Sequence, residues 1–450
     1  MMTGLAIVPG AGPRSLLCGA LALLLVACGG DGPTESGPTE SGQTNPVPAV
    51  TSLQPGIILA GASGFTLTVK GANFMESSVV LWNGSDRPTK YVDGGSLEAE
   101  IPESDVATDG AAAVTVSNPS PGGGGSGAAT FEILATSAGL IVFDAWRDSG
   151  GNGEIYVMHP DGSAQVRLTH SPGWDIWPFW SPDGSKIVFR STRDGDFEIY
   201  TVDLNGSGEI NLSRAPNAED TPDDWSPDGS RLAFTTNRDG NKEIYVTNAD
   251  GTNHVNLTRS PGSDREADWS PDGSPFAFTS VRNGKDEIFV MNAVGTGAAC
   301  LTGSMAPASD PAWSPDGSRI AFTVTQGGAG EVFVMNADGT GIVNVSNSPA
   351  LDDWPAWSPD GSKLAFTSNR DGNYEIYSVA ADGTDLMNVS SSAENEWRPA
   401  WSPDGDWIAC ERFSGGEWSE IFILSPDGQA QVNLTNARES DRGPRWRPQP

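Results

Sequence analysis

Short apolar segments separated by turn residues recur along most of the chain. Between residues 139 and 450, segments such as Ile187-Val188-Phe189 and Leu364-Ala365-Phe366 are bounded by clusters of Asp, Gly, Asn and Pro. Short runs rich in aromatic and branched side chains, with turn signals on both sides, are typical of β-strands. We therefore expect an all-β structure over this region.

These segments fall into a repeating unit of four, and its most regular mark is the run Trp-Ser-Pro-Asp-Gly. Successive tryptophans of the motif are 45, 44, 44, 44 and 44 residues apart, a fixed period that indicates a repeat architecture. The Asp-Gly pairs supply the positive φ of tight hairpin turns. Four antiparallel strands of this size form one blade of a β-propeller, with the tryptophan in its core. The tryptophans are Trp180, Trp225, Trp269, Trp313, Trp357 and Trp401.

The two ends of the repeat region complement each other. The first unit begins at Ile141-Val142-Phe143 and lacks the segment that ends in tryptophan, whereas Gly443-Pro444-Arg445-Trp446 supplies one at the far end. Pairing the two in one blade would close a ring and remove exposed sheet edges. We therefore predict a seven-bladed β-propeller over residues 137–450, closed by pairing of its N- and C-terminal strands. A six-bladed ring, the alternative, would leave one unit over.

A different pattern occupies residues 48–134. Phe65-Thr66-Leu67-Thr68-Val69-Lys70 alternates apolar and polar residues, and Val79-Val80-Leu81-Trp82 ends at the turn Asn83-Gly84. Short alternating strands joined by turns predict an Ig-like β-sandwich. The expected fold class of the chain is therefore all-β, with this sandwich ahead of the propeller.

The first residues carry an export signal. Arg14 precedes an apolar run too short to span a membrane as a mature helix, which predicts a signal peptide over residues 1–27. Leu25-Val26-Ala27-Cys28 resembles the bacterial lipobox, and that resemblance implies lipidation of Cys28; a plain signal peptide is the alternative. Gly29 at the next position implies the outer membrane or cell surface, with the periplasmic face also possible.

A tether follows the signal. No apolar side chain other than proline occurs between Asp31 and Pro46. A segment of this composition cannot bury a core, so residues 28–47 are expected to be a disordered spacer.

Two parts of the chain resemble known families. The six Trp-Ser-Pro-Asp-Gly runs resemble the TolB-like repeats of the WD40-like group, which implies a propeller and leaves its partners open. Residues 48–134 resemble the IPT/TIG family, which implies a spacer or binding module. The residues that carry the second resemblance are Pro55, Gly71-Ala72-Asn73-Phe74, Trp82-Asn83-Gly84, Ile101-Pro102, Val114-Thr115-Val116-Ser117-Asn118-Pro119 and Gly122-Gly123-Gly124.

The charge of the chain restricts its partners. The sequence has 58 Asp and Glu against 26 Lys and Arg, a formal net charge of −32. Such a surface repels nucleic-acid phosphates and attracts cations or a basic partner. Only Cys300 and Cys410 lie in the predicted folded regions, three units apart, so we expect no disulfide framework.

An acidic residue recurs five positions before the periodic tryptophan. In the propellers that the sequence resembles the first strand is innermost, which would place these acids at the channel mouth. There they could hold a basic peptide or a cation such as Ca²⁺, which prefers oxygen ligands. Alternatively, each accepts backbone N–H bonds within its own blade, which we favour because a residue repeated in every unit usually serves the repeat. The acids are Asp175, Asp220, Asp264, Asp352, Glu396 and Asp441, while the fourth unit has Ala308 with Asp310 nearby.

Less uniform residues near the same position are better candidates for specificity. Aromatic side chains beside acids can form a platform for a peptide or a sugar, although local packing would also explain them. These residues are Trp174, Trp177, Trp354, Trp397 and Arg398. We also expect the Glu that opens each third segment to form ion pairs with the arginines upstream of it, each of little energy. Those arginines are Arg147, Arg193, Arg238, Arg282 and Arg370.

The sequence offers little for catalysis. His159, His170 and His254 are isolated from one another, and no Gly-x-Ser-x-Gly motif occurs. We therefore predict a non-enzymatic cell-envelope lipoprotein whose propeller is a scaffold for an envelope protein or peptide, without a cofactor. A surface module that binds polysaccharide is the first alternative, and a metal-dependent propeller enzyme is the weaker second.

Overall fold

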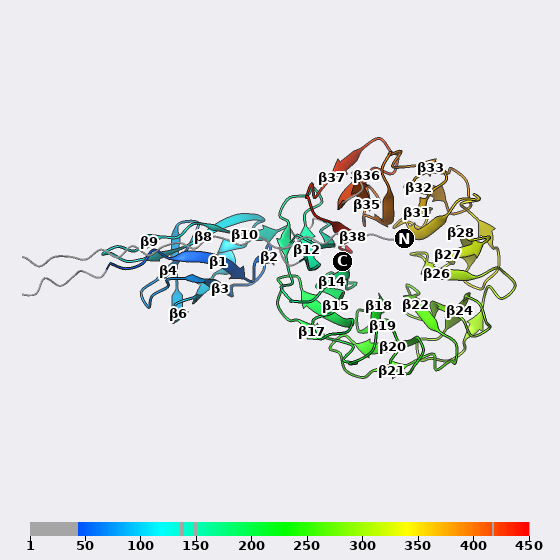
Figure 1. Ribbon diagram of the computed structural model, residues 1–450, viewed down its shortest axis with the longest axis horizontal. Coiled ribbons are helices and arrows are strands. Elements are labelled where there is room, and N and C mark those ends of the chain that lie inside the picture. The colour runs from blue at the N-terminus through cyan, green and yellow to red at the C-terminus, as the bar shows by residue number, and fades with distance from the viewer. Residues whose placement is uncertain (1–43, 136–138, 148–150, 416–417, 450) are drawn as a thin grey trace, which may run out of the picture. The chain divides into compact units, whose positions relative to one another are not determined.

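The computed structural model of the chain describes residues 44–135, 139–147, 151–415 and 418–449 (Figure 1). The predicted signal peptide, the lipidation site Cys28 and the tether as far as residue 43 lie outside these ranges. The described chain is all-β, because its elements are strands apart from the short 3₁₀ helix η1 (Glu103–Asp105). Within the described ranges no helix has the length and hydropathy to cross a bilayer.

The first domain consists of two sheets. One has the order β1-β3-β7-β6 and the other β2-β10-β8-β4-β5, with β9 paired to β8. Leu67, Val69, Trp82 and Phe131 from both sheets belong to one buried cluster, as the alternation of residues 65–70 predicted. The strands are β1 (Ala49–Gln54), β2 (Ile57–Leu59), β3 (Phe65–Ala72), β4 (Val79–Trp82), β5 (Ser85–Arg87), β6 (Thr89–Asp93), β7 (Ser96–Ile101), β8 (Gly110–Asn118), β9 (Gly124–Gly125) and β10 (Ala129–Leu134).

The described residues from 141 to 446 contain seven antiparallel four-stranded sheets, which lie around a common centre with their first strands innermost (Figure 1). The first strands are β14 (Asp175–Trp180), β18 (Asp220–Trp225), β22 (Asp264–Trp269), β26 (Ala308–Trp313), β30 (Asp352–Trp357), β34 (Glu396–Trp401) and β38 (Asp441–Trp446). The second strands are β15 (Lys186–Ser191), β19 (Arg231–Thr236), β23 (Phe276–Ser280), β27 (Arg319–Gln326), β31 (Lys363–Ser368), β35 (Ile408–Ser414) and β11 (Ile141–Ala145).

The outer half of each sheet follows the same order. The third strands are β16 (Glu198–Asp203), β20 (Glu243–Asn248), β24 (Glu287–Met291), β28 (Ala329–Asn336), β32 (Glu375–Ala380), β36 (Trp418–Leu424) and β12 (Glu154–Met158). The fourth strands, only two or three residues long, are β17 (Ile210–Asn211), β21 (Val255–Asn256), β25 (Ala299–Cys300), β29 (Val343–Asn344), β33 (Met387–Asn388), β37 (Gln431–Asn433) and β13 (Val166–Arg167). Such short edge strands offer little template for pairing with another chain.

The Asp-Gly turns form as the sequence predicted. In the turn between β30 and β31, the Asp360 carboxylate accepts hydrogen bonds from Ser358 Oγ (2.7 Å) and from the backbone N–H of Ser362 (3.0 Å). Gly361 has a φ of 68°, which a residue without a Cβ adopts at no steric cost. The hydrogen bonds from Ser358 and Ser362 lower the pKa of Asp360 to about 2. The motif is thus a self-contained hairpin turn.

The periodic tryptophans lie in the core. Trp225 and Trp269 are only 3% and 4% exposed, and Trp357 and Trp401 are half-buried. The indole N–H of Trp357 donates to the carbonyl of Ala312 in the preceding sheet, at 2.9 Å. Each tryptophan therefore belongs to packing within and between sheets and is not presented to a ligand.

Strand β38 pairs with β11, so the last strand of the chain is the first strand of the sheet that contains residues 141–158. The ladder joins Ile141 to Trp446 and Ala145 to Asp441. This pairing is the one that the missing segment of the first unit predicted.

Candidate functional site

The recurrent acids are buried ion-pair partners. The side chains of Asp175, Asp220, Asp264, Asp352, Glu396 and Asp441 have no solvent exposure. Each pairs with an arginine of its own sheet, for example Asp352 with Arg370 at 3.0 Å and Asp441 with Arg147 at 2.7 Å. The unit with Ala308 has Gln326 where its neighbours have arginine, so both partners are missing together. These acids do not face a ligand, and they are excluded from the candidate site.

The same contacts correct the expected partner of the arginines. They bind the recurrent acid of the first strand rather than the Glu of the third, and they stack on the intervening aromatic rings; Arg370 lies 4.6 Å from the Tyr377 ring centroid. Glu375 instead accepts hydrogen bonds from Asn388 Nδ2 (2.8 Å) and the backbone N–H of Ser392 (2.7 Å). The reason is geometric: arginine Nη2 reaches along the sheet to the innermost strand, while the Glu lies beside the fourth.

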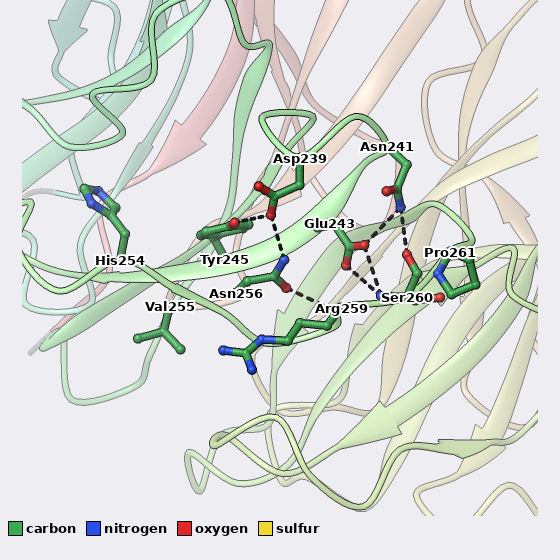
Figure 2. A pocket seen from close by; sticks show the side chains of 10 residues that line it. All are labelled: Asp239, Asn241, Glu243, Tyr245, His254, Val255, Asn256, Arg259, Ser260 and Pro261. Carbon is green, nitrogen blue, oxygen red and sulfur yellow. Dashed lines mark hydrogen bonds between the residues drawn. The ribbon is translucent and has the colours of Figure 1, made fainter.

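A cavity of about 750 Å³ on the outer part of one sheet belongs to the repeat (Figure 2). In it the hydroxyl of Tyr245 and the amide of Asn256 both donate to Asp239. The same triad recurs as Asp371, Tyr377 and Asn388 in another sheet and as Asp194, Tyr200 and Asn211 in a third. A network repeated from sheet to sheet, with its polar atoms paired, supports the fold and does not mark a site.

The innermost strands carry a shared backbone irregularity. Two residues after the recurrent acid the chain enters the left-handed region, and the pairing with the second strand shifts register there, as a β-bulge does. The residues with this φ, between 55° and 61°, are Trp177, Glu266, Asp310, Trp354, Arg398 and Gly443, and Pro222 has the equivalent place in β18. Only one of them is glycine, so the conformation costs energy that the fold must offset.

Carboxylates of neighbouring strands stabilise these bulges. Asp144 accepts the N–H of Trp177 at 3.1 Å, Glu266 accepts that of Asp310 at 3.2 Å, and Glu411 accepts that of Gly443 at 2.6 Å. A charged acceptor strengthens a hydrogen bond to a backbone N–H. The bulge is thus held by an acceptor of its main-chain N–H, and its conformation does not depend on which side chain stands there, although the Glu266 side chain serves as the acceptor for the next unit.

All seven bulge positions line one cavity of about 890 Å³, which we call the inner cavity. Its lining has as many acidic as basic side chains, although the chain as a whole has a net charge of −32. The acidic ones are Glu219, Asp223, Asp224, Glu266 and Asp310, and the basic ones are Arg190, Lys242, Arg265, Arg398 and Arg445. Concave sites that combine aromatic walls with a few convergent charges are the usual ligand sites of proteins.

Four of the five acids lie on one side, in β18, β22 and β26, together with Lys242 and Arg265, and they perturb one another. Burial, with the charges of Glu266 and Asp353, raises the pKa of Asp310 to about 7. Burial also raises the pKa of Asp268 and of Asp144 to about 7. Among the described residues no group of three His, Cys, Asp or Glu side chains is arranged to hold a metal ion. We call this side of the cavity the acidic wall.

This acidic wall gives a testable pH dependence. A carboxyl whose pKa is higher folded than unfolded binds protons more strongly when folded, so its contribution to stability falls as pH rises from about 4 to 7. Asp310→Asn removes the charge, and we expect it to raise the free energy of unfolding by roughly 1–2 kcal/mol at pH 8, and by less at pH 4.5. Urea unfolding at both pH values measures this. Asp385→Asn is the control, since Asp385 has the same φ of 55° but is exposed; equal effects of the two variants would contradict the prediction.

The opposite side of the inner cavity is formed by aromatic and arginine side chains. Trp177 is 43% exposed, and the Arg398 guanidinium lies 5.9 Å from its ring centroid and 5.5 Å from that of Trp354. Trp397 packs against Trp354, with ring centroids 5.5 Å apart. Three of the predicted specificity residues are therefore gathered around this cavity, while Trp397 supports them from behind.

Trp174 does not line the inner cavity. Its ring lies 5.5 Å from that of Trp146, and it is 45% exposed. The sequence-based interpretation missed Glu266, Asp223 and Arg445 and noted Asp310 only as a neighbour of Ala308, although all four line the cavity. Their position in the repeat could have identified two of them, because Glu266 and Asp310 stand at the same place in their units as Trp177 in its own.

The cavity lining holds no histidine, cysteine or serine among the described residues. His254 lies on the outer part of its sheet, where its Nε2–H donates to the carbonyl of Leu212 at 2.6 Å. The side chains that face the inner cavity can therefore bind charged and aromatic groups, and they include none of the usual nucleophile and base pairs.

Comparisons with known proteins agree with this architecture. The TolB beta propeller domain family profile matches residues 141–223, 212–307 and 304–450, and the IPT/TIG domain profile matches residues 48–133. A TolB homolog of Chlorobium luteolum is 35% identical over 81 residues, 16% of this chain and 18% of that one. The Tol-Pal system protein TolB of Bordetella pertussis is 41% identical over 54 residues, 12% of each chain. The chain thus matches under a fifth of the length of these curated relatives.

Among solved structures, an oligogalacturonate lyase in complex with manganese is similar, with a TM-score of 0.51 and 17% identity. The match covers 66% of this chain and 85% of the lyase. At this identity the likeness concerns the fold alone.

Proposed function

Because the chain belongs to the TolB β-propeller family, we propose that it is a binding scaffold of the cell envelope, without catalytic activity, that takes up a segment of a protein or peptide in its inner cavity. The observation that carries the proposal is the inner cavity itself. Its seven bulge residues differ from unit to unit, whereas the residues that build the sheets repeat. The bulge positions hold six residue types in seven units, and such variety in a cavity lining is what a specific binding site requires.

The ring that would surround this site has seven blades in our proposal. The seven four-stranded sheets of the described residues and the ladder between β11 and β38 support it. When the last strand pairs with the first unit, each of the seven sheets has its own innermost strand. Hydrogen bonds between β11 and β38 would then close the ring.

Export and lipidation complete the proposal. The leader ahead of Cys28 supports an export signal, and the acylated cysteine would hold the chain at the outer membrane or the cell surface. The IPT/TIG domain would then act as a spacer between tether and propeller. Release of a Cys28→Ser variant into the soluble fraction is the expected result, and its continued membrane association would contradict the anchor.

The function is tested by capture from envelope extract with the full chain, in parallel with a glycan array. We expect the wild type to capture a protein partner, and the Trp177→Ala, Trp354→Ala double variant to capture at least tenfold less of it. Trp418→Ala is the control, since Trp418 is equally exposed, at 43%, but lies in β36 outside the cavity lining. If the double variant captured as much partner as the wild type, the proposed function would be wrong.

A glycan-binding module is the second candidate, because exposed tryptophans such as Trp177 offer stacking faces for sugar rings. Binding to the glycan array without any protein partner, abolished in the same double variant, would favour it.

A further inference from the structure

We infer that Arg398 and Arg445 form a carboxylate-binding subsite of the inner cavity, which selects a peptide segment with a single acidic group. This inference rests on the proposed function and names the chemistry of its ligand. Both arginines line the cavity, one from β34 and the other from β38.

Arg398 is held in place for this role. Its Nη1 donates to Glu411 Oε1 at 3.0 Å, and its guanidinium lies beside the rings of Trp177 and Trp354. Glu411 also fixes the adjacent bulge by accepting the N–H of Gly443. A guanidinium has five N–H donors in a planar fork, so this single carboxylate contact leaves donors for a second acceptor.

Arg445 lacks such a partner. Its side chain is part of the cavity lining, and its Nη1 donates to the carbonyl of Pro444, at 3.0 Å. No carboxylate of the described residues lies within 4.0 Å of its guanidinium, whereas an acid of the same sheet pairs with each of Arg147, Arg193, Arg282, Arg370 and Arg412. The charge of the neighbouring Arg398 acts against that of Arg445. A ligand carboxylate between the two guanidiniums would relieve their mutual repulsion and form charge-assisted, bidentate hydrogen bonds.

The acidic wall across the cavity limits what else the ligand can carry. Asp223, Glu266 and Asp310 line the same cavity. Above the pKa of Asp310, about 7, where this carboxyl is ionised, they would repel a polyanion, such as a chain of uronic acids, that placed one carboxylate on the arginines and the next near this wall. A peptide with one acidic group beside neutral or basic residues meets both sides favourably. Charge complementarity of the cavity therefore favours a peptide over an acidic polysaccharide.

Selection from peptide libraries tests this inference. The probes are random seven-residue peptides displayed with both ends fused, where only Asp and Glu supply a carboxylate, and a second library with a free C-terminus. Each is panned on the full chain and on Arg445→Ala, Arg398→Ala and Arg445→Lys. Arg259→Ala is the control, because Arg259 is exposed and lies outside the inner cavity. Thermal unfolding confirms that each variant is folded.

We expect the selected peptides to contain an acidic side chain, or a free C-terminal carboxylate in the second library. Arg445→Ala and Arg398→Ala should each weaken their binding at least tenfold, Arg445→Lys should weaken it less, and Arg259→Ala should not. Selected peptides without an acid, or with binding unchanged in Arg445→Ala, would overturn the inference; if Trp354→Ala still weakened them, the proposed function would stand. Enrichment of no peptide would overturn both. Binding of oligogalacturonates that Arg445→Ala abolishes, without peptide binding, would assign the subsite to a sugar and overturn the peptide inference.

Discussion

Deleting residues 440–450 is expected to leave the repeat region without a cooperative folded state. The deletion removes β38, and with it the innermost strand of the sheet formed by β11, β12 and β13. Trp446, 9% exposed, and the ion pair of Asp441 with Arg147 are lost together. Loss of a buried tryptophan costs about 3–5 kcal/mol and loss of one partner of a buried ion pair about 3–5 kcal/mol. Their sum is comparable with the whole stability of an ordinary domain, about 5–15 kcal/mol.

Thermal unfolding followed by circular dichroism measures this effect, with limited proteolysis as a second readout. A chain that lacks only residues 448–450 is the control, because β38 remains intact in it. A cooperative transition within a few degrees of the wild type after deletion of 440–450 would show that β38 is dispensable.

Arg370→Ala is expected to destabilise the chain by about 3–5 kcal/mol at pH 7, because it leaves the Asp352 carboxylate buried without a cation. The Asp352 side chain has no solvent exposure and lies 3.0 Å from Arg370. Replacing both residues by alanine should recover part of the loss, since no charge then remains buried. Urea unfolding of the two single variants and the double variant gives the coupling free energy directly.

Arg319→Ala is the matched control for stacking. The Arg319 guanidinium lies 5.0 Å from the Trp357 ring centroid, against 4.6 Å between Arg370 and the Tyr377 ring centroid. Arg319 donates to the carbonyl of Gly361 and not to a carboxylate. If both arginine variants lost the same stability, the stacking and not the ion pair would explain the effect of Arg370→Ala.

Sequence periodicity predicted the sheets well because each unit contains its own turns. The Ser-Pro-Asp-Gly hairpin depends on contacts within a few residues, such as that of Asp360 with Ser362, and such contacts can be inferred from sequence. The pairing of β38 with β11 followed from an inventory of segments, since one unit lacked what the end of the chain supplied. The sandwich of residues 48–134 was predicted by alternation for the same local reason.

The roles of charged side chains were harder to predict, because they depend on distances across strands. Asp352 and Arg370 are 18 positions apart, and only the sheet brings them together. The aromatic residues Trp177 and Trp354 were identified as candidates, whereas Glu266 and Asp310 were not grouped with them. All four have a left-handed backbone conformation at the same position of the repeat. Residue type does not predict this conformation here, since Trp, Glu, Asp, Arg and Gly all adopt it.

The bulge in the innermost strands separates the residues that build the sheets from those that line the inner cavity. The tryptophans and the turn aspartates recur from unit to unit, and so do the buried ion pairs except in the unit with Ala308 and Gln326, because each sheet packs on the next in the same way. The bulge position is held by its main chain and by carboxylate acceptors such as Glu411, so different side chains occupy it from unit to unit. Glu266 is an exception, because its own carboxylate also holds the bulge of the next unit. The same four-stranded unit is thus repeated, while one position of its innermost strand presents different side chains to the cavity. The chain's recognition can change at this position while the frame that displays it stays constant.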